Sequence, residues 1–219
     1  MLRTFLAAMA ATCLSAANLV VTVDTTALPA GSYYLGYQFG NGDSAYANNQ
    51  IYLSQFSSTG GLTYAHPATL DGWATNPVAG EYQLVDDDPA LIPAFFNGVL
   101  LSFAAPGGAS SLTFLLTTTN VYAGPGFADT FTMSILNDSF FSTRESGGFD
   151  APILQLLLDG SVGGPSVSVW ASNVAPYDGV PAPNVADGDV PEVSTYGLIG
   201  AGLLAMALGR RKLAVAHVA

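Results

Sequence analysis

The middle of the chain consists of short segments in which apolar and polar side chains alternate. Tyr33, Leu35, Tyr37 and Phe39 alternate with smaller or more polar neighbours, which is the period of two expected of a strand with one buried face. Each such segment is bounded by glycine, proline, asparagine or aspartate, which favour turns. The pattern predicts about nine strands, at residues 19–23, 33–39, 51–56, 81–85, 95–103, 111–119, 130–136, 153–158 and 166–171.

This strand pattern predicts an all-β fold class. No segment of the body has a convincing helical period, so the helical crossovers that parallel strands need are missing. The 24 glycines and 13 prolines also argue against a helical bundle. We therefore expect an antiparallel, two-sheet β-sandwich of the jelly-roll type over residues 18–175. Residues 176–189 are rich in Pro, Gly and Asp and lack an apolar period, which predicts a flexible linker.

The first 17 residues have the layout of a secretory signal peptide. A short basic start at Arg3 precedes an apolar run over residues 4–14, and small residues lead to a cut between Ala17 and Asn18. Signal peptidase is therefore an expected partner. A buried N-terminal helix is one alternative; lipidation of Cys13 is the other, and it is disfavoured because no leucine stands three positions earlier. The cut would remove Cys13 and leave a mature chain without disulfides.

The last thirty residues predict one C-terminal transmembrane helix. Residues 193–209 contain no charge, and at about 1.5 Å per residue such a helix is roughly 25 Å long, close to the thickness of a bilayer core. Arg210, Arg211 and Lys212 follow directly, and a basic cluster beside a span stays in the cytoplasm. We therefore expect the body on the far side of the membrane, with residues 213–219 as a short tail.

The order of motif, apolar segment and basic cluster over residues 190–212 resembles a PEP-CTERM sorting tag. In that family, an exosortase of exopolysaccharide-producing Gram-negative bacteria reads a Pro-Glu-Pro motif in front of a short membrane helix. The resemblance implies that Pro191 and Glu192 are the recognition residues and that Arg210, Arg211 and Lys212 hold the tag in the inner membrane. Val193 stands where the family usually has proline, and an ordinary C-terminal anchor is the alternative.

The body also resembles a group of exosortase-tagged, β-rich proteins. The similar positions are an opening at residues 24–26 and 31–35 and a later strand at residues 131–136. This second resemblance implies a β-rich fold and no particular activity.

The charge distribution excludes nucleic acid as a partner. The chain has 16 acidic and 5 basic residues, for a formal charge of -11. Arg144 is the one basic residue between Arg3 and Arg210. So acidic a body repels the phosphates of nucleic acids and anionic lipids.

Two features suggest binding chemistry. Trp73 lies in an Asp-Gly-Trp-Ala turn, where an exposed ring is a candidate contact for a glycan, whereas Trp170 ends an alternating strand and is expected in the core. Asp86, Asp87 and Asp88 form the densest acidic cluster, and their oxygens are candidate ligands for calcium as a structural ion. Ordinary turn chemistry is the alternative for these aspartates, and no other cofactor is expected.

Catalytic chemistry finds little support. Glu81, Glu145 and His66 are the candidate acids and base of a hydrolase, but their spacing marks no pair, and no nucleophile motif accompanies His66. We therefore expect a non-enzymatic surface or extracellular-matrix protein, exported and processed by an exosortase. The alternative is a carbohydrate-binding, lectin-like module that recognises exopolysaccharide, and a secreted polysaccharide hydrolase ranks third.

Overall fold

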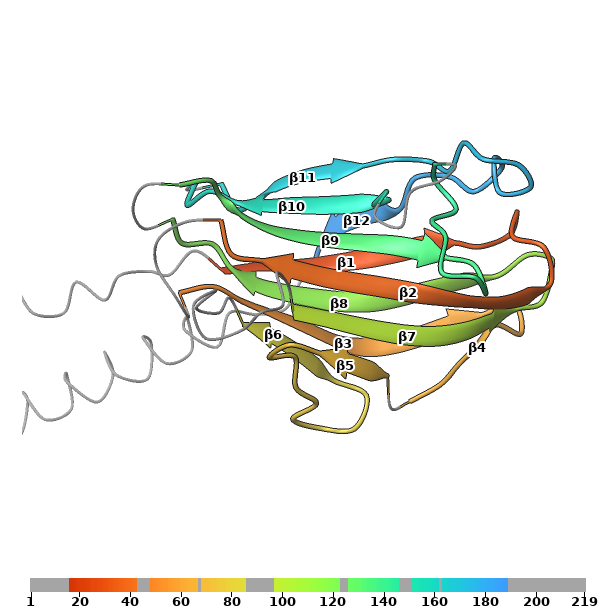
Figure 1. Ribbon diagram of the computed structural model, residues 1–219, viewed down its shortest axis with the longest axis horizontal. Coiled ribbons are helices and arrows are strands. Elements are labelled where there is room, and N and C mark those ends of the chain that lie inside the picture. Colours follow the sequence, from red (N-terminus) through yellow and green to blue (C-terminus); the bar gives the residue numbers. More distant parts are fainter. Residues whose placement is uncertain are drawn as a thin grey trace, which may run out of the picture. The chain divides into compact units, whose positions relative to one another are not determined.

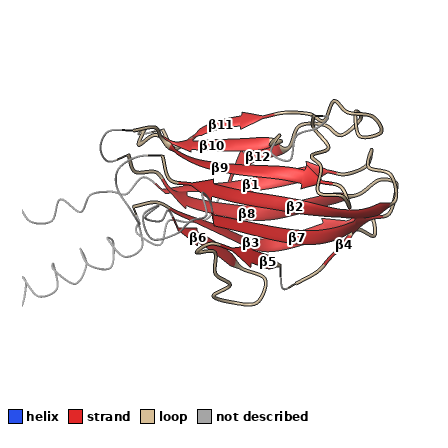
Figure 2. Cartoon of the chain, viewed as in Figure 1, coloured by secondary structure: helices blue, strands red, loops and turns tan. Residues whose placement is uncertain are grey.

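The residues that the structure describes form strands and their connections (Figures 1 and 2). The computed structural model describes residues 16–42, 48–66, 68–85, 97–122, 126–145, 151–161 and 163–188. These residues contain no helix, and hence no helical segment of the length and hydropathy needed to cross a membrane. The strands are β1 (Ala16–Asp24), β2 (Gly31–Gly40), β3 (Gln50–Thr59), β4 (Thr63–Tyr64), β5 (Thr69–Asp71), β6 (Tyr82–Val85), β7 (Asn97–Ala105), β8 (Ser111–Thr119), β9 (Asp129–Leu136), β10 (Leu154–Leu158), β11 (Ser166–Val169) and β12 (Asn184–Asp187).

The strands form two antiparallel sheets, which confirms the predicted β-sandwich. The five-stranded sheet has the order β12-β1-β8-β3-β6. The seven-stranded sheet has the order β11-β10-β9-β2-β7-β4, and β5 also pairs with β7. Sequence neighbours such as β1 and β2 lie in different sheets, so the short connections cross repeatedly between the two layers (Figure 1).

The alternating side chains explain how the layers meet. In β2, Tyr33, Leu35, Tyr37 and Phe39 are buried, whereas the residues between them are partly exposed. The same alternation in β8 and β9 points large apolar side chains inward, where the rings of Tyr37 and Phe114 meet edge to face across the two sheets at 5.5 Å. Burying such side chains contributes roughly 1.5–3 kcal/mol each. The core therefore follows from the period-two pattern.

Three strands were missed by the pattern, and one of them corrects a domain boundary. β4 and β5 are too short to show a period. β12 lies within the segment predicted to be a flexible linker, but it pairs with β1, and Val180 just before it is 1 % exposed. Residues 180–188 therefore belong to the sandwich. Pairing with β1, rather than apolar content of its own, orders this edge strand.

The first strand begins slightly earlier than predicted. β1 starts at Ala16, with Ala17 opposite Thr118 and Asn18 opposite Thr117. The expected cut between Ala17 and Asn18 would therefore remove the first two residues of β1 and leave the remaining strand paired. The rest of the signal peptide, residues 1–15, and the transmembrane helix at 193–209 lie outside the described residues.

Candidate functional site: an uncharged row across the five-stranded sheet

Five polar residues form a row across the outer face of the five-stranded sheet. Thr75 lies opposite Gln83, Gln83 opposite Tyr52, Tyr52 opposite Thr117, and Thr117 opposite Asn18. Because neighbouring strands are about 4.8 Å apart, this Tyr52 row is roughly 19 Å long. Four of its residues lie on strands, and Thr75 forms an isolated bridge to β6. All five side chains are uncharged, so the sandwich presents an extended neutral strip to solvent.

Tyr52 is the aromatic centre of the row, and its orientation is fixed by two amides. The Tyr52 hydroxyl donates to Gln50 Oε1 at 2.9 Å, and Gln83 Nε2 donates to the Tyr52 hydroxyl at 2.8 Å. Gln50 lies two residues earlier on the same face of β3, so these bonds hold the ring along the strand. The residue is 38 % exposed. The arrangement therefore presents an aromatic surface in a defined orientation.

The two amides keep further hydrogen-bonding capacity. Gln83 Nε2 also donates to Gln50 Oε1 at 3.2 Å. Within the described residues, Gln83 Oε1 and Gln50 Nε2 have no protein partner. Gln83 in the row and the adjacent Gln50 thus offer one acceptor and one donor beside an aromatic ring. A pair of neighbouring hydroxyl groups on a ligand matches this set because each hydroxyl both donates and accepts.

The face around the row carries few charges. Among the outward residues of the described strands of this sheet, Asp24 at the end of β1 is the one charged side chain. Two further carboxylates are exposed at its margins, Glu81 just before β6 and Asp187 on the edge strand β12. Hydrogen bonds from the side chain and the backbone N–H of Thr26 lower the pKa of Asp24, so its negative charge is held at the sheet's end. A neutral ligand on the Tyr52 row therefore displaces water without stripping an ion of its hydration.

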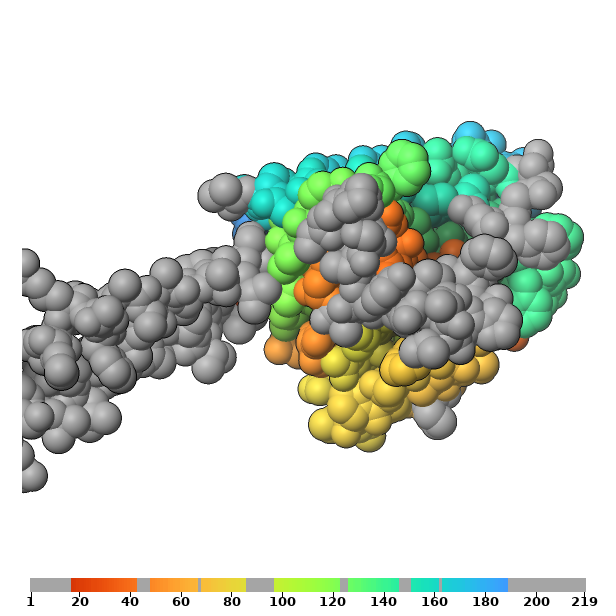
Figure 3. All heavy atoms as spheres, turned by 60° about the vertical axis from the view of Figure 1, so that its left-hand side comes forward, coloured from red at the N-terminus to blue at the C-terminus, as the bar shows by residue number. Residues whose placement is uncertain are grey.

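Trp73 lies at the edge of the sandwich, on the connection that leads to the row. β5 pairs with β7 of the seven-stranded sheet, and Thr75 pairs with β6 of the five-stranded sheet, so the intervening turn passes from one layer to the other. The turn is held by buried Asn97, which accepts from the Trp73 N–H and donates to the Val85 carbonyl. Trp73 is 50 % exposed, as predicted from its position in a turn. In Figure 3 the gold segment that contains this turn forms one margin of the molecule.

The candidate hydrolase residues do not form a catalytic group in the described part of the chain. His66 Nδ1 and the Tyr82 hydroxyl share a short hydrogen bond, and burial raises the pKa of Tyr82. The His66 ring also packs edge to face against Phe56 and Tyr64, with centroids 5.7 and 5.1 Å away. These contacts make His66 part of an aromatic cluster.

The two candidate carboxylates lie elsewhere. Glu145 pairs with Arg144, and Glu81 is exposed in front of β6. Among the described residues, no hydrogen bond or ion pair joins Glu81, Glu145 and His66. The same residues contain no group of three His, Cys, Asp or Glu side chains that would hold a metal ion.

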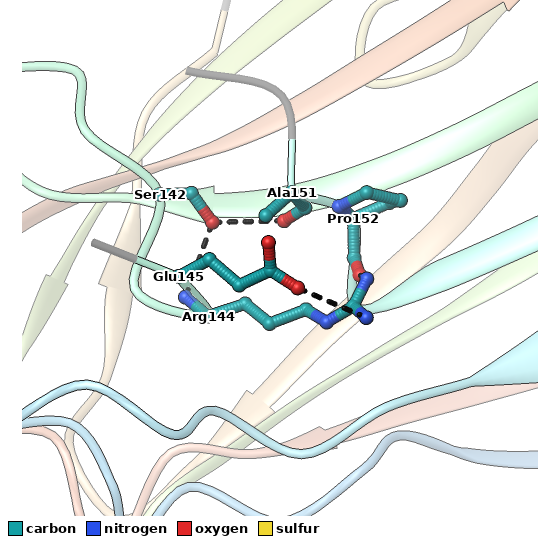
Figure 4. Close-up of polar contacts among 5 residues, drawn as sticks. All are labelled: Ser142, Arg144, Glu145, Ala151 and Pro152. Atoms are coloured by element: carbon teal, nitrogen blue, oxygen red, sulfur yellow. Dashed lines mark hydrogen bonds and ion pairs between the residues drawn. The ribbon is translucent and has the colours of Figure 1, made fainter. Parts of the chain in front are cut away.

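Arg144 joins three segments beside the seven-stranded sheet (Figure 4). Its Nη1 donates to the Pro152 carbonyl at 2.8 Å, its Nη2 lies 3.3 Å from Glu145 Oε1, and its guanidinium lies 4.4 Å from the centroid of the Trp170 ring. Trp170 is half-buried under this cation, so its expected place in the core is wrong. Ser142 completes the cluster, accepting from the Arg144 N–H at 3.1 Å and donating to the Ala151 carbonyl at 2.8 Å.

Several predicted site residues lie outside the described residues. These are the calcium candidates Asp86, Asp87 and Asp88, the sorting residues Pro191 and Glu192, and the basic cluster Arg210, Arg211 and Lys212. Their roles stay predictions.

Sequence reasoning missed the Tyr52 row because a row depends on strand order. The polar series Gln50, Tyr52 and Ser54 on one face of β3 was visible, but its partners Gln83 and Thr117 were not. No family model, curated protein or solved structure matches the chain.

Proposed function

We propose that this chain is a non-enzymatic protein exported to the cell surface or extracellular matrix, where its sandwich binds a neutral polysaccharide. In this proposal a signal peptide directs export, the C-terminal helix holds the chain briefly in the inner membrane, and an exosortase acts at Pro191 and Glu192. We also propose that the sandwich is of the jelly-roll type.

The sorting part is supported by the sequence at the two ends. The signal peptide and the basic cluster at residues 210–212 independently require the same topology, with the body across the inner membrane. The order of motif, apolar segment and basic cluster resembles the PEP-CTERM tag, and hosts that use this tag make exopolysaccharide.

The binding part is carried by one observation, the Tyr52 ring held between Gln50 and Gln83 in a row of uncharged residues. Sugar rings combine apolar C–H faces with rims of hydroxyl groups, so they suit an aromatic surface flanked by a free donor and acceptor. An acidic polymer would be repelled by a chain of charge -11. The proposed ligand is therefore neutral.

Mass spectrometry of both termini, on protein recovered separately from membrane and extracellular fractions of the host, tests the sorting part. The expected extracellular form begins at Asn18 and ends within residues 191–195. A membrane-bound chain that extends to Ala219, with none released, would instead indicate a simple anchor.

Affinity electrophoresis of the released protein tests the binding part. The gels contain a neutral glucan, galactomannan or xylan, and alginate is the acidic control. Tyr52→Ala and Gln83→Ala are expected to weaken binding to the retained polymer about tenfold, the effect of losing roughly 1.4 kcal/mol at a central contact. Phe127→Ala is the matched control, because this ring is 85 % exposed and lies outside the row. Equal retention of wild type, Tyr52→Ala and Gln83→Ala would contradict the proposed site.

Trp73 is a second candidate contact, favoured by its exposure at the edge that leads to the row. Trp73→Ala is expected to reduce retention on the same polymer. Unchanged retention of the folded variant would remove Trp73 from the site and leave the Tyr52 row as the test of binding.

A further inference from the structure

A shallow hollow of about 280 Å³ lies on the seven-stranded sheet, the layer opposite the Tyr52 row. Its floor is formed by two sets of cross-strand neighbours. Ala104 on β7 lies between Thr63 on β4 and Ser32 on β2, and Ser102 on β7 lies opposite Tyr34 on β2. Because Ser32, Ser102 and Ala104 are small, the surface sinks between the larger side chains of Tyr34 and Thr63. The lining is completed by Tyr33, Tyr64, Ala65 and Phe103.

The hollow is neutral and rich in hydroxyl groups. No charged residue lines it. Within the described residues, the side-chain hydroxyls of Ser32, Tyr34, Thr63 and Ser102 make no hydrogen bond to the protein. Each can therefore donate to and accept from a ligand without breaking an internal contact. Its volume is slightly below the roughly 300–1,000 Å³ of typical small-molecule sites, which suits a ligand unit of modest size.

A strained residue, which does not itself line the hollow, packs against the lining residue Tyr34. Phe140 has a φ of +63°, a left-handed conformation that costs a bulky residue about 1–2 kcal/mol. Its ring stacks on Tyr34 with centroids 4.7 Å apart and is 44 % exposed. Glycine would adopt this φ without the cost, so the position retains an exposed ring at the expense of strain.

The surrounding turn fixes this conformation. Asn137 Oδ1 accepts from the N–H groups of Ser139 and Phe141 at 2.9 and 3.0 Å, and the Asn137 carbonyl accepts from the Phe140 N–H at 2.9 Å. Backbone strain held in place by its surroundings is concentrated at functional sites. Phe140 therefore supports the Tyr34 ring from behind and orients it beside the hydroxyls of Ser32, Thr63 and Ser102.

We propose that this hollow is a second site for a neutral sugar unit, and that it makes the sandwich bivalent. The inference rests on the carbohydrate binding proposed above. The Tyr52 row and the hollow lie on the outer faces of opposite sheets, which point in opposite directions, so one stiff polysaccharide segment does not reach both. A protein molecule with both sites occupied therefore joins two polymer segments.

Titration of the released protein with a hexasaccharide of the polymer that it retains tests the second site. Wild type is expected to bind two equivalents. Tyr34→Ala and Ala104→Trp are each expected to bind one, because the first removes the aromatic ring and the second fills the hollow without altering Tyr34 or the core. Tyr52→Ala should also bind one, and Phe127→Ala should bind two. Circular dichroism checks that each variant is folded.

Cross-linking gives the second readout. Wild type mixed with the intact polymer should raise the viscosity of the solution, and each single-site variant should lose this effect while still binding. The inference is overturned if Tyr34→Ala and Ala104→Trp still bind two equivalents, or if wild type binds one equivalent that Tyr52→Ala abolishes. Absence of any wild-type binding would overturn the proposed carbohydrate binding itself, which is a different result.

Discussion

Removing one buried hydroxyl is expected to stabilise the protein. Tyr37 is 1 % exposed in the middle of the core, and its hydroxyl has no hydrogen-bond partner within the described residues. Burying an unsatisfied hydroxyl costs about 1–3 kcal/mol. Tyr37→Phe removes that cost and leaves a void of roughly 10 Å³, which costs about 0.2 kcal/mol. The aromatic contacts with Phe114 and Phe131 remain. The net expectation is a gain of about 1–2 kcal/mol.

Urea unfolding, followed by tyrosine and tryptophan fluorescence, measures this gain. It corresponds to a rise in Tm of about 3–6 °C for a domain of this size. Tyr33→Phe is the matched control: the Tyr33 hydroxyl donates to the Pro29 carbonyl at 3.0 Å, so the same chemical change there should cost about 0.5–1.5 kcal/mol. A loss of stability in Tyr37→Phe equal to that in Tyr33→Phe would show that the Tyr37 hydroxyl is hydrogen-bonded in solution and would refute the reasoning.

Two further predictions concern charge. Arg144→Ala should lower the free energy of unfolding by about 2–3 kcal/mol, because it removes a charged hydrogen bond to the Pro152 carbonyl and the cation above Trp170. Glu145→Gln should cost under about 0.5 kcal/mol, since that carboxylate is exposed; equal losses in urea unfolding would assign the stabilisation to the ion pair instead. Burial raises the pKa of Tyr37 well above its usual value. Above about pH 10 the unfolded chain therefore loses this proton first, and stability should fall with rising pH. Tyr37→Phe should make Tm less dependent on pH between 9.5 and 11, and an unchanged slope would contradict the assignment.

Local sequence patterns were sufficient to predict the core residues but not the two surface sites. The alternation in β2 identified Tyr33, Leu35, Tyr37 and Phe39 as buried because one strand alone decides which face is apolar. The Tyr52 row and the hollow combine residues from three or more strands, and neighbours across a sheet depend on strand order, which a local period does not encode.

Two local features were also invisible in the sequence. Phe140 gave no signal because its positive φ is imposed by the hydrogen bonds of Asn137 rather than by its own preference. β12 gave none because its order comes from β1. Strand pairing and turn geometry, rather than composition, therefore decide where ligands would find a surface.

The pairing of β12 with β1 has a mechanical consequence. β1 begins and β12 ends at the same pole of the sandwich, where the Gly188 N–H donates to the Asn18 carbonyl at 2.7 Å. The turn from β1 into β2 lies at the opposite pole (Figure 1), and Ser32 and Tyr34 at the start of β2 line the hollow there. If the proposed tag tethers the chain while a polymer pulls at the proposed second site, tension would run along the strands. It would load the pairs from Leu19–Asp187 to Thr22–Asn184 in shear, all at once rather than one after another. A short edge strand that is loaded in shear in this way can resist a pulling force.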